Sequence, residues 1–470
     1  MKFGGTSMGS AERIRIAASI CEEHHKQRPV AAVVSAMSKI TDLLLDTLRH
    51  AEGGDSAGVN ANLETLAARH RESCSELLSG DLRQSTQAQL DSITAEFERI
   101  ARGVLMLGER PPKSVDEAIA VGERLSSHLI AACLQSRGID AFAVNARDVV
   151  VTDAVFGNAS PLLEPTREKA LNILKPALEA GRLPIVTGFN GATLDGRPTT
   201  LGRGGSDFSA SILASVLDAA ELYIWTDVDG IMTADPRLVP DAAVLDEVTY
   251  SEAAELAYSG AKVLHPRTLA PLVEQKVPVW SKNSFALDKP GTQIVPSIAT
   301  GHGPRAVTSM ANVALVSLES ASAAVSGTKA MARALDALAA ANAEVLALSS
   351  SSYRQSFCFL VRKDELPAVL ACLESTLSLE FAHGYLRPVE VDENVGLLSI
   401  VGEGMKGTPG VAGRIFTAIS RENINIIAIA QGSSELTIAI VVSREGLERA
   451  VRAVHEECRM GERARAARRP

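Results

Sequence analysis

Short apolar runs alternate with longer amphipathic stretches along residues 1–281 of the chain. The stretches at residues 11–24 and 114–134 repeat their apolar positions with helical spacing. Because strands alternate with helices through short connections, the pattern predicts an α/β fold with a mainly parallel sheet. The runs that suit buried parallel strands lie at residues 29–35, 141–145, 183–188, 221–226 and 277–281.

Residues 55–107 break this alternation, because they are charged, helical in pattern and poor in β-forming residues. We expect them to form a helical excursion on one face of the sheet. His70 and Cys74 share a helix face there, but no nearby residue completes a metal site. We therefore expect His70 to be a surface residue.

The last third of the chain repeats itself after a linker-like stretch at residues 298–305. Ala314 aligns with Val395 and Asn342 with Asn423, a constant offset of 81 residues. Each copy has the pattern strand, helix, strand, strand, helix. Two such halves usually pair to build small-molecule sites, so we expect a second, ligand-binding region.

Composition and charge narrow the class of protein. The chain has 470 residues, a formal net charge of −9 and six cysteines. A negative net charge gives no general attraction to nucleic acid or to anionic membranes. The cysteines are scattered without zinc spacing and no secretory signal or membrane-spanning run is visible, so we expect a cytoplasmic protein with no metal centre of its own.

The first seven residues, MKFGGTS, form the first candidate site. Gly4 and Gly5 allow the backbone to come close to a ligand, and the helix that follows points its positive end at the same place. Lys2 adds a charge that reaches phosphate oxygens. These residues fit a phosphate cradle and equally a plain strand-to-helix turn, because short glycine motifs match by chance.

Polar side chains after other predicted strands are candidate substrate contacts. Ser35 and Thr41 follow the run at residues 29–35, at the end of a parallel strand where open α/β sheets bind ligands. Thr41 also suits the cap of the next helix, and the two roles are compatible. Glu123 is either a solvated helix residue or the partner of a substrate ammonium.

A second glycine-rich turn, TLGRGGSD, occupies residues 200–207 before another predicted helix. Arg203 suits bidentate binding of a carboxylate, and Asp207 suits an ammonium. We favour this interpretation over a plain capped turn, because two glycines, an arginine and an aspartate seldom occur together in one turn.

The polar loop at residues 227–237 follows the run at residues 221–226 and suits the edge of a nucleotide site. Asp227, Asp229 and Asp235 lack the spacing and the final glutamate of a calcium-binding EF-hand loop. We therefore expect the loop to handle a nucleotide with Mg²⁺. Further along, Lys262 and His265 lie at a predicted helix end.

Taken together, these stretches resemble aspartate kinases of the amino-acid kinase family, over nearly the whole chain. The matching motifs, in the order of the family, are KFGGTS, SAMSKIT, VGER, LGRGGSD, WTDVDGI with DPR, GAKVLHPRT and PGT. The C-terminal repeat resembles tandem ACT domains. The resemblance implies a three-layer αβα kinase domain with a mainly parallel sheet, followed by two ferredoxin-like ACT domains. The implied boundaries are residues 1–297 for the kinase domain, 298–310 for the linker, and 311–385 and 386–470 for the two ACT domains.

The resemblance implies phosphorylation of the side chain of L-aspartate by ATP with Mg²⁺, which gives 4-phospho-L-aspartate for the synthesis of lysine, threonine and methionine. Lys2, Arg203 and Asp207 take the catalytic places. The implied aspartate-binding residues are Ser35, Thr41, Glu123, Arg203, Gly204, Ser206 and Asp207. The implied nucleotide-binding residues are Lys2, Gly4, Gly5, Thr226, Asp227, Met232, Arg237, Lys262 and Val263. Met232 stands where many relatives have tyrosine, so an aromatic contact with the nucleotide is in doubt.

Regulation is expected in the second ACT copy, whose stretch NINIIAIAQGSSE is most similar to threonine-sensitive aspartate kinases. The implied effector contacts are Asn425, Ile426 and Gln431. The first copy has Glu344 and Ser350 at the places of Asn425 and Gln431, so we expect it to be weak or silent. Threonine is the first candidate effector and lysine the second, and ACT pairing between subunits predicts a homo-oligomer.

Two rival functions remain open. One is a kinase for another amino acid, such as glutamate, which the LGRGGSD turn and the ACT pair disfavour. The other is an amino-acid sensor without catalysis, which the presence of Lys2, Arg203 and Asp207 disfavours.

Overall fold

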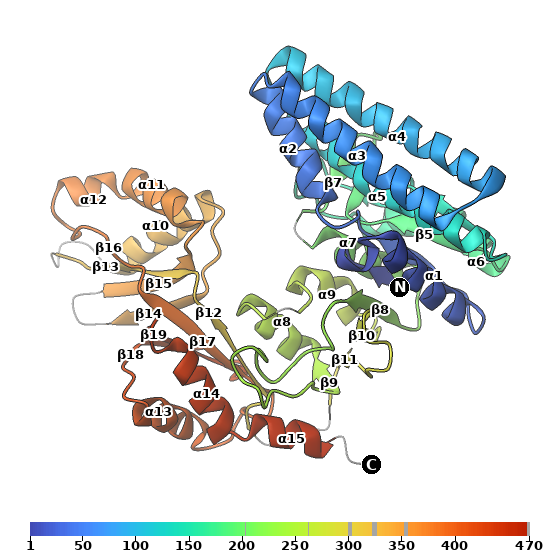
Figure 1. Ribbon diagram of the computed structural model, residues 1–470. Helices are drawn as coiled ribbons and strands as arrows, with labels where there is room; N and C mark the ends of the chain where they lie inside the picture. Colours follow the sequence, from blue (N-terminus) through green and yellow to red (C-terminus); the bar gives the residue numbers. More distant parts are fainter. Residues whose placement is uncertain (203, 262, 299–302, 322–326, 352–355, 468–470) are drawn as a thin grey trace. The chain divides into compact units, whose positions relative to one another are not determined.

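The computed structural model describes residues 1–202, 204–261, 263–298, 303–321, 327–351 and 356–467. The chain forms two compact units. The first comprises residues 1–230 and 267–296, and the second comprises residues 231–266 and 297–470. Figure 1 labels their elements and colours them along the sequence.

A mainly parallel sheet forms the centre of the first unit. Its neighbouring strands follow the order β3-β5-β2-β1-β8-β10-β11. The pairs from β3 to β10 are parallel, and β10 pairs with β11 antiparallel. These strands are β1 (Lys2–Phe3), β2 (Ala32–Val34), β3 (Ala141–Val144), β5 (Leu183–Thr187), β8 (Leu222–Thr226), β10 (Val279–Asn283) and β11 (Thr292–Val295). The predicted α/β fold with a mainly parallel sheet is confirmed.

Helices cover this sheet. Helices α1 and α5 pack together, with α5 against β3 and β5, while α6 and α7 pack together, with α7 against β1, β2 and β8. The helices of the unit are α1 (Ala11–His25), α2 (Ile40–Glu52), α3 (Ser56–Leu77), α4 (Gly80–Leu107), α5 (Pro112–Gln135), α6 (Leu163–Glu179), α7 (Gly205–Val216), and the short 3₁₀ helices η1 (Thr6–Met8) and η2 (Ala146–Asp148). Helix α9 (Pro266–Val273) lies at the start of residues 267–296, the later segment of this unit.

Helices α2 to α5 lie side by side in Figure 1. Among them, α3 and α4 form the helical excursion predicted at residues 55–107. The apolar faces of α2 to α5 belong to one core with α1 and the sheet, including Leu66, Leu90 and Leu125. The expectation that His70 is a surface residue is wrong. His70 is buried in this core with its Nδ1 2.8 Å from the Leu66 carbonyl oxygen, because the neighbouring helices cover a face that one helix alone would expose.

A small second sheet leads the chain from β5 to the second glycine-rich turn. It has the order β4-β6-β7, with β4 (Val151–Thr152) parallel to β6 (Asn190–Thr193) and β7 (Pro198–Thr200) antiparallel to it. Thr200 ends β7 and is buried. The turn that follows therefore starts from a fixed strand end.

The second unit contains two antiparallel four-stranded sheets, with the orders β14-β15-β13-β16 and β12-β17-β19-β18. Their strands are β12 (Ala306–Met310), β13 (Val313–Leu318), β14 (Ala347–Ser351), β15 (Ser356–Arg362), β16 (Glu390–Asp392), β17 (Val395–Val401), β18 (Ile426–Gln431) and β19 (Thr437–Ser443). The helices that follow the strands are α10 (Gly327–Ala340), α11 (Leu366–Thr376), α12 (Ser378–Ala382), α13 (Val411–Arg421), α14 (Leu447–Glu457) and α15 (Met460–Ala467). The strand and helix pattern expected for each copy is present.

The two sheets exchange strands across the expected limits of the repeat. Residues 306–310, which we expected in the linker, form β12 and pair with β17 of the second copy. Residues 390–392, expected in the second copy, form β16 and pair with β13 of the first copy. Each sheet therefore takes one edge strand from outside the expected limits of its copy. A shared core that includes Leu315, Leu360 and Leu397 joins the two sheets.

Residues 231–266 are part of the second unit, with β9 (Glu247–Thr249) and α8 (Tyr250–Tyr258). The buried side chain of Glu252 connects this segment to the second ACT copy. One carboxylate oxygen lies 2.8 Å from Nη1 of Arg305, and the other accepts a hydrogen bond from the backbone N–H of Glu403 at 2.9 Å. Thr437 also donates to Glu255 at 2.8 Å.

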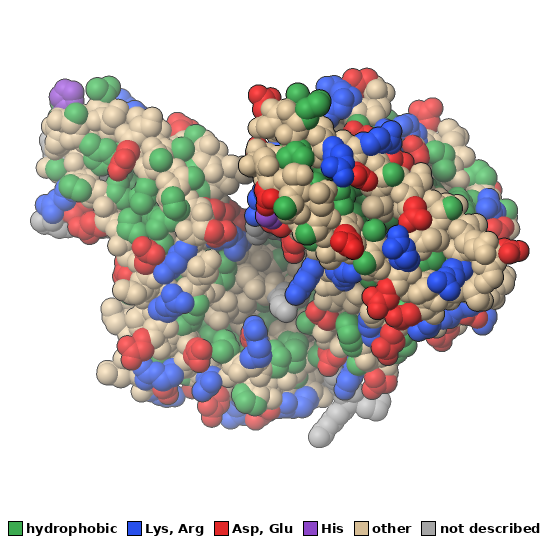
Figure 2. Space-filling view, turned by 45° about the horizontal axis from the view of Figure 1, so that its top comes forward, with side chains coloured by type: hydrophobic (Ala, Val, Ile, Leu, Met, Phe, Trp, Pro, Cys, Tyr) green, Lys and Arg blue, Asp and Glu red, His purple; other side chains and the backbone are tan. Residues whose placement is uncertain are grey.

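Acidic and basic side chains are interspersed on the face of the molecule drawn in Figure 2. This agrees with the modest net charge, since neither sign dominates the face. Among the described residues, no helix is both long enough and apolar enough to cross a membrane.

Candidate active site

The first glycine turn lies at the middle of the sheet. Lys2 is in β1, opposite Val33 of β2 and Ile224 of β8, and its side chain is mostly buried. The chain then turns through Gly4 and Gly5. A Cβ on Gly5 would come 3.3 Å from the Ala36 carbonyl oxygen, and one on Gly4 would come 3.3 Å from Nζ of Lys2. Glycine therefore leaves room around the lysine ammonium group at the strand ends.

The second glycine turn meets this lysine. Nζ of Lys2 lies 2.7 Å from Oδ1 of Asp207, which is in the first turn of α7. Gly204 precedes the helix with a φ of +69°, in the left-handed region that favours glycine. The positive end of the helix stabilises the Asp207 carboxylate, and the ion pair brings together residues that are about 200 positions apart in the chain.

Glu123 of α5 approaches the same turn from the side. Its Oε1 accepts a hydrogen bond from Oγ of Ser206 at 2.6 Å. Its Oε2 is buried and has no hydrogen-bond partner among the described residues. Burial raises the pKa of this carboxyl to about 8, against the lowering effects of the Ser206 hydroxyl and the Lys2 charge. A carboxyl of this kind is suited to accept a cationic ligand, which would supply the missing partner.

These residues line one cavity of about 510 Å³ at the carboxyl ends of the parallel strands. Ser35 and Thr41 line it as well, together with Gly5, Gly204 and Ser206. Its other lining residues are Thr6, Ala36, Met37, Ser38, Lys39, Asp42, Phe189, Gly202 and Gly205. The structure therefore brings Lys2, Ser35, Thr41, Glu123, Gly204, Ser206 and Asp207 together at this cavity.

Sequence reasoning did not select several of these lining residues. Lys39 has a φ of +66° immediately before α2, and Phe189 has a φ of +22° after β5. A Cβ on Gly205 would lie 2.5 Å from Cβ of Phe189, so this glycine lets α7 begin against the loop. The apolar Phe189 carried no chemical signal, whereas Lys39 stood inside the quoted SAMSKIT motif.

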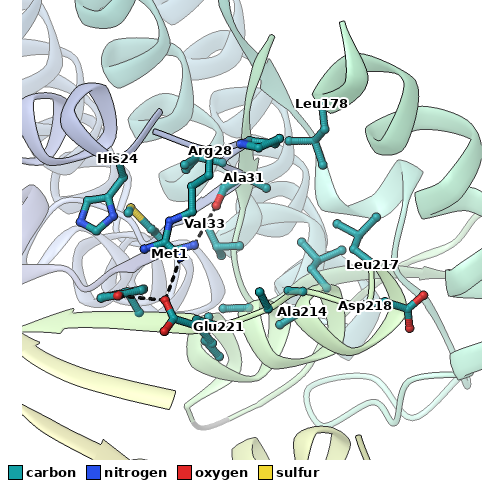
Figure 3. A pocket seen from close by; sticks show the side chains of 18 residues that line it. Met1, His24, Arg28, Ala31, Val33, Leu178, Ala214, Leu217, Asp218 and Glu221 are labelled. Atoms are coloured by element: carbon teal, nitrogen blue, oxygen red, sulfur yellow. Dashed lines mark hydrogen bonds and ion pairs between the residues drawn. The ribbon is translucent and has the colours of Figure 1, made fainter. Parts of the chain in front are cut away.

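A second cavity, of about 380 Å³, lies at the opposite ends of the same strands (Figure 3). The start of the chain lies in it, with the Met1 amino group donating to the Ala31 carbonyl oxygen at 2.8 Å. Arg28 points toward Glu221 across it, with 2.8 Å between their charged groups. None of the site residues predicted from the sequence lines this cavity, so the candidate active site is the one at the carboxyl ends.

The predicted nucleotide contacts fall in both units. Thr226 is the last residue of β8 and Asp227 follows it, both in the first unit. Asn283 holds the loop there by donating to Asp229 at 2.6 Å. Met232, Arg237 and Val263 belong to the second unit. The Arg237 side chain is exposed and paired with Asp235 at 2.6 Å. Arg203 and Lys262 lie outside the described residues.

The predicted effector residues lie along β18 in the second ACT copy. Asn425, immediately before the strand, and Gln431, at its end, are exposed, and Ile426 at the start of the strand is half-buried. The corresponding face of the first copy has a cavity of about 400 Å³, lined by Ser349 and Ser350 among others. The glycine-rich loop of the second copy, GMKGTPG at residues 404–410, is held by Glu435, which accepts from the Gly407 N–H at 2.7 Å.

The described residues around this site do not form a metal cage of their own. Among the described residues, no group of three or more His, Cys, Asp or Glu side chains could hold a metal ion. Kinases bind Mg²⁺ largely through phosphate oxygens, with one or two carboxylates. Of the carboxylates that line the cavity, Asp42 fits this chemistry, since Asp207 pairs with Lys2 and Glu123 accepts from Ser206.

Comparison with known proteins identifies the class. Residues 1–283 match the model of the amino acid kinase family, and residues 398–458 match an ACT domain model. Because the first match covers more than half of the chain, the chain belongs to the amino acid kinase family. The resemblance stated from the motifs is confirmed.

Particular relatives narrow the comparison. The chain is 37% identical over 463 residues to the bifunctional aspartokinase/homoserine dehydrogenase 1, chloroplastic, of Arabidopsis thaliana, an alignment that covers 97% of this chain and 50% of the relative. The chain thus spans about half the length of the bifunctional relatives it matches. It is also similar to the structure of E. coli aspartokinase III in complex with aspartate and ADP, with 30% identity, a TM-score of 0.82, and coverage of 97% of this chain and 98% of that one. The T-state complex of that enzyme with lysine and aspartate matches with 30% identity, the same coverage and a TM-score of 0.78.

Proposed function

We propose that this chain is an aspartate kinase, which transfers the γ-phosphoryl group of ATP to the side-chain carboxylate of L-aspartate to give 4-phospho-L-aspartate. The observation that carries the proposal is the meeting of the two glycine turns at one cavity, where Lys2 pairs with Asp207 beside Glu123. The E. coli relative whose structure holds aspartate and ADP supports the choice of both ligands.

The cavity suits the charges of an amino acid. The buried Glu123 and the Asp207 carboxylate would receive the α-ammonium group, while Arg203 would bind the α-carboxylate. Ser35, Thr41, Gly204 and Ser206 would supply hydroxyl and amide groups around the substrate. An analogue that lacks either charged group would leave a buried charge unpaired, so the site should reject it strongly.

The reaction needs positioning and charge neutralisation more than proton transfer. The nucleophile is a carboxylate that is already ionised at neutral pH, so no general base is required. Lys2 would stabilise the charge on the transferred group, with the amides of Gly4 and Gly5 beside it and Mg²⁺ held by phosphate oxygens. The proposed nucleotide contacts beyond this cavity are Thr226, Asp227, Met232, Arg237, Lys262 and Val263.

For regulation we propose an effector site at Asn425, Ile426 and Gln431 in the second ACT domain, with threonine as the first candidate and lysine as the second. We propose a kinase domain at residues 1–297, a linker at 298–310, and ACT domains at 311–385 and 386–470. The protein would act in the cytoplasm as a homo-oligomer. The product would enter the synthesis of lysine, threonine and methionine. The E. coli relative that binds lysine supports an amino-acid effector.

A hydroxamate assay tests the activity directly. The purified chain, ATP and Mg²⁺ are incubated with hydroxylamine and either L-aspartate or L-glutamate, and the acyl hydroxamate is measured. We expect product with aspartate and less than about one hundredth as much with glutamate, because one extra methylene displaces the side-chain carboxylate from the phosphoryl group.

The other outcomes of this assay separate the rivals. Product with glutamate but not with aspartate would replace the proposal with a glutamate-type kinase. No product with either amino acid, together with binding of an amino acid in calorimetry, would replace it with a sensor.

A further inference from the structure

Asp116 is a buried carboxylate that the motifs did not select. It lies in the second turn of α5 with 1% of its surface exposed. Its Oδ2 accepts hydrogen bonds from the backbone N–H groups of Gly157 at 2.8 Å and Thr200 at 3.0 Å, and its Oδ1 accepts one from Oγ1 of Thr200 at 2.8 Å. Burying a carboxylate is costly unless hydrogen bonds compensate. Two of the three bonds here come from Thr200, where the chain leads into the candidate site.

Thr200 is the residue at which the small sheet ends and the second glycine turn begins. Gly202, two residues later, lines the cavity, whereas Asp116 does not. The Gly157 loop also packs against this turn. A Cβ on Gly202 would lie 2.7 Å from Oδ1 of Asn158, and the Ala159 N–H donates to the Thr200 carbonyl oxygen at 2.8 Å. Asp116 therefore joins the two segments that fix where the turn starts.

The far end of the turn is held by the same helix. Glu123 follows Asp116 by seven residues, which is close to two helical turns, so both carboxylates lie on one face of α5. Glu123 accepts from Ser206 at the end of the turn, while Asp116 accepts from Thr200 at its start. One rigid helix thus sets the positions of both ends of the segment that presents Gly202, Gly204, Ser206 and Asp207 to the cavity.

We infer that Asp116 is a positioning residue for amino-acid recognition: it holds the start of the Thr200–Asp207 turn so that the turn meets Lys2 and the substrate in the right place. The inference rests on the proposed aspartate kinase activity. Loss of this hold would displace the substrate-binding turn, and displacements of about 1 Å are enough to reduce turnover by one to two orders of magnitude.

The test compares Asp116→Ala with Asp116→Asn in the full chain. Alanine removes all three hydrogen bonds. Asparagine keeps them, because its amide oxygen can accept from both N–H groups while its NH₂ group donates to the Thr200 hydroxyl. We expect Asp116→Ala to raise the KM for aspartate by about ten-fold or more, with the KM for ATP within about two-fold of wild type. In Asp116→Asn, the KM for aspartate should return most of the way to the wild-type value.

Two controls separate positioning from stability. Glu117→Ala removes a carboxylate from the next, exposed residue of α5 and should change neither constant. Leu66→Ala opens a cavity in the helical core far along the chain from the turn, and should lower the melting temperature without changing the ratio of the two KM values. If Asp116→Ala does not fold, Thr200→Val takes its place in the test, because it removes only the hydrogen bond from the Thr200 hydroxyl to Asp116.

Hydrogen exchange without substrate provides a readout that does not depend on activity. Amides of residues 200–207 should exchange at least several-fold faster in Asp116→Ala than in wild type or Glu117→Ala. Unchanged exchange there, or equal increases in both KM values, would overturn the inference. A wild-type chain that fails to phosphorylate aspartate would overturn the proposed function instead, and the exchange result would still decide whether Asp116 holds the turn.

Discussion

Burial in the cavity changes the ionisation of a single residue, Glu123. Glu123 is buried with one oxygen bound by Ser206 and the other without a partner among the described residues, and its pKa is raised to about 8 by burial. The free protein therefore holds Glu123 protonated at neutral pH. A bound ammonium group would take the place of this proton, which links substrate binding to ionisation of the site.

The raised pKa of Glu123 should make the stability of the protein depend on pH. Because the pKa of Glu123 is about 8 when folded and near 4.5 when unfolded, the folded state binds more protons between these values. Its contribution to stability is therefore present at low pH and is lost as the pH rises from about 4.5 through 8. Scanning calorimetry should show that Glu123→Gln, which stays neutral, gains melting temperature relative to wild type between pH 5.5 and 8.5. A constant difference between the two proteins over that range would contradict the assignment.

Residue types also explain what the sequence could show. Asp207 was selected because two glycines, an arginine and an aspartate seldom occur together in one turn. Lys2 and Glu123 each had an ordinary structural alternative and were selected through the family resemblance. Phe189 and Asp116 were not, since an apolar side chain and a carboxylate near the start of a helix are both common. The burial of His70 was mispredicted because the packing of α2 to α5 around it is a tertiary property.

At the scale of elements, the parallel strands β2, β3, β5, β8 and β10 could be predicted because each lies in a short apolar run before a polar turn. The partners of β12 and β16 could not. Both are short edge strands whose residues fit a linker equally well, and they join sheets beyond the expected repeat limits. Their pairing depends on the packed core between the two sheets, which no local pattern encodes.

Substitutions in strands β14 and β18 test which ACT copy binds the effector. Gln431 ends β18, and Ser350 is its counterpart in β14, so Gln431→Ala and Ser350→Ala form a matched pair. If threonine binds the second copy, Gln431→Ala should raise the concentration of half-inhibition by about ten-fold, which corresponds to one lost hydrogen-bonding side chain. Ser350→Ala should change it by less than about two-fold.

Inhibition curves with threonine, lysine and both together provide the measurement. A larger effect of Ser350→Ala would move the effector site to the first copy, where the cavity of about 400 Å³ lies. Insensitivity of the wild type to millimolar threonine would remove threonine as the effector.

At the scale of the whole molecule, the segment 231–266 belongs to the same unit as the ACT domains. Glu252 and Glu255 connect it to the second copy, and the proposed nucleotide contacts Met232, Arg237 and Val263 lie on it. These hydrogen bonds join the second ACT copy to the segment that carries the proposed nucleotide contacts.

The central claim is that Lys2 and the turn around Asp207 form one phosphoryl-transfer site, and Lys2→Ala tests it most directly. Titration calorimetry measures aspartate binding and the hydroxamate assay measures turnover, with the exposed Lys26→Ala as the control. We predict that Lys2→Ala binds aspartate within about ten-fold of wild type but loses turnover by about 1,000-fold or more, because the lysine acts on the phosphoryl group. Turnover within about ten-fold of wild type would contradict the account.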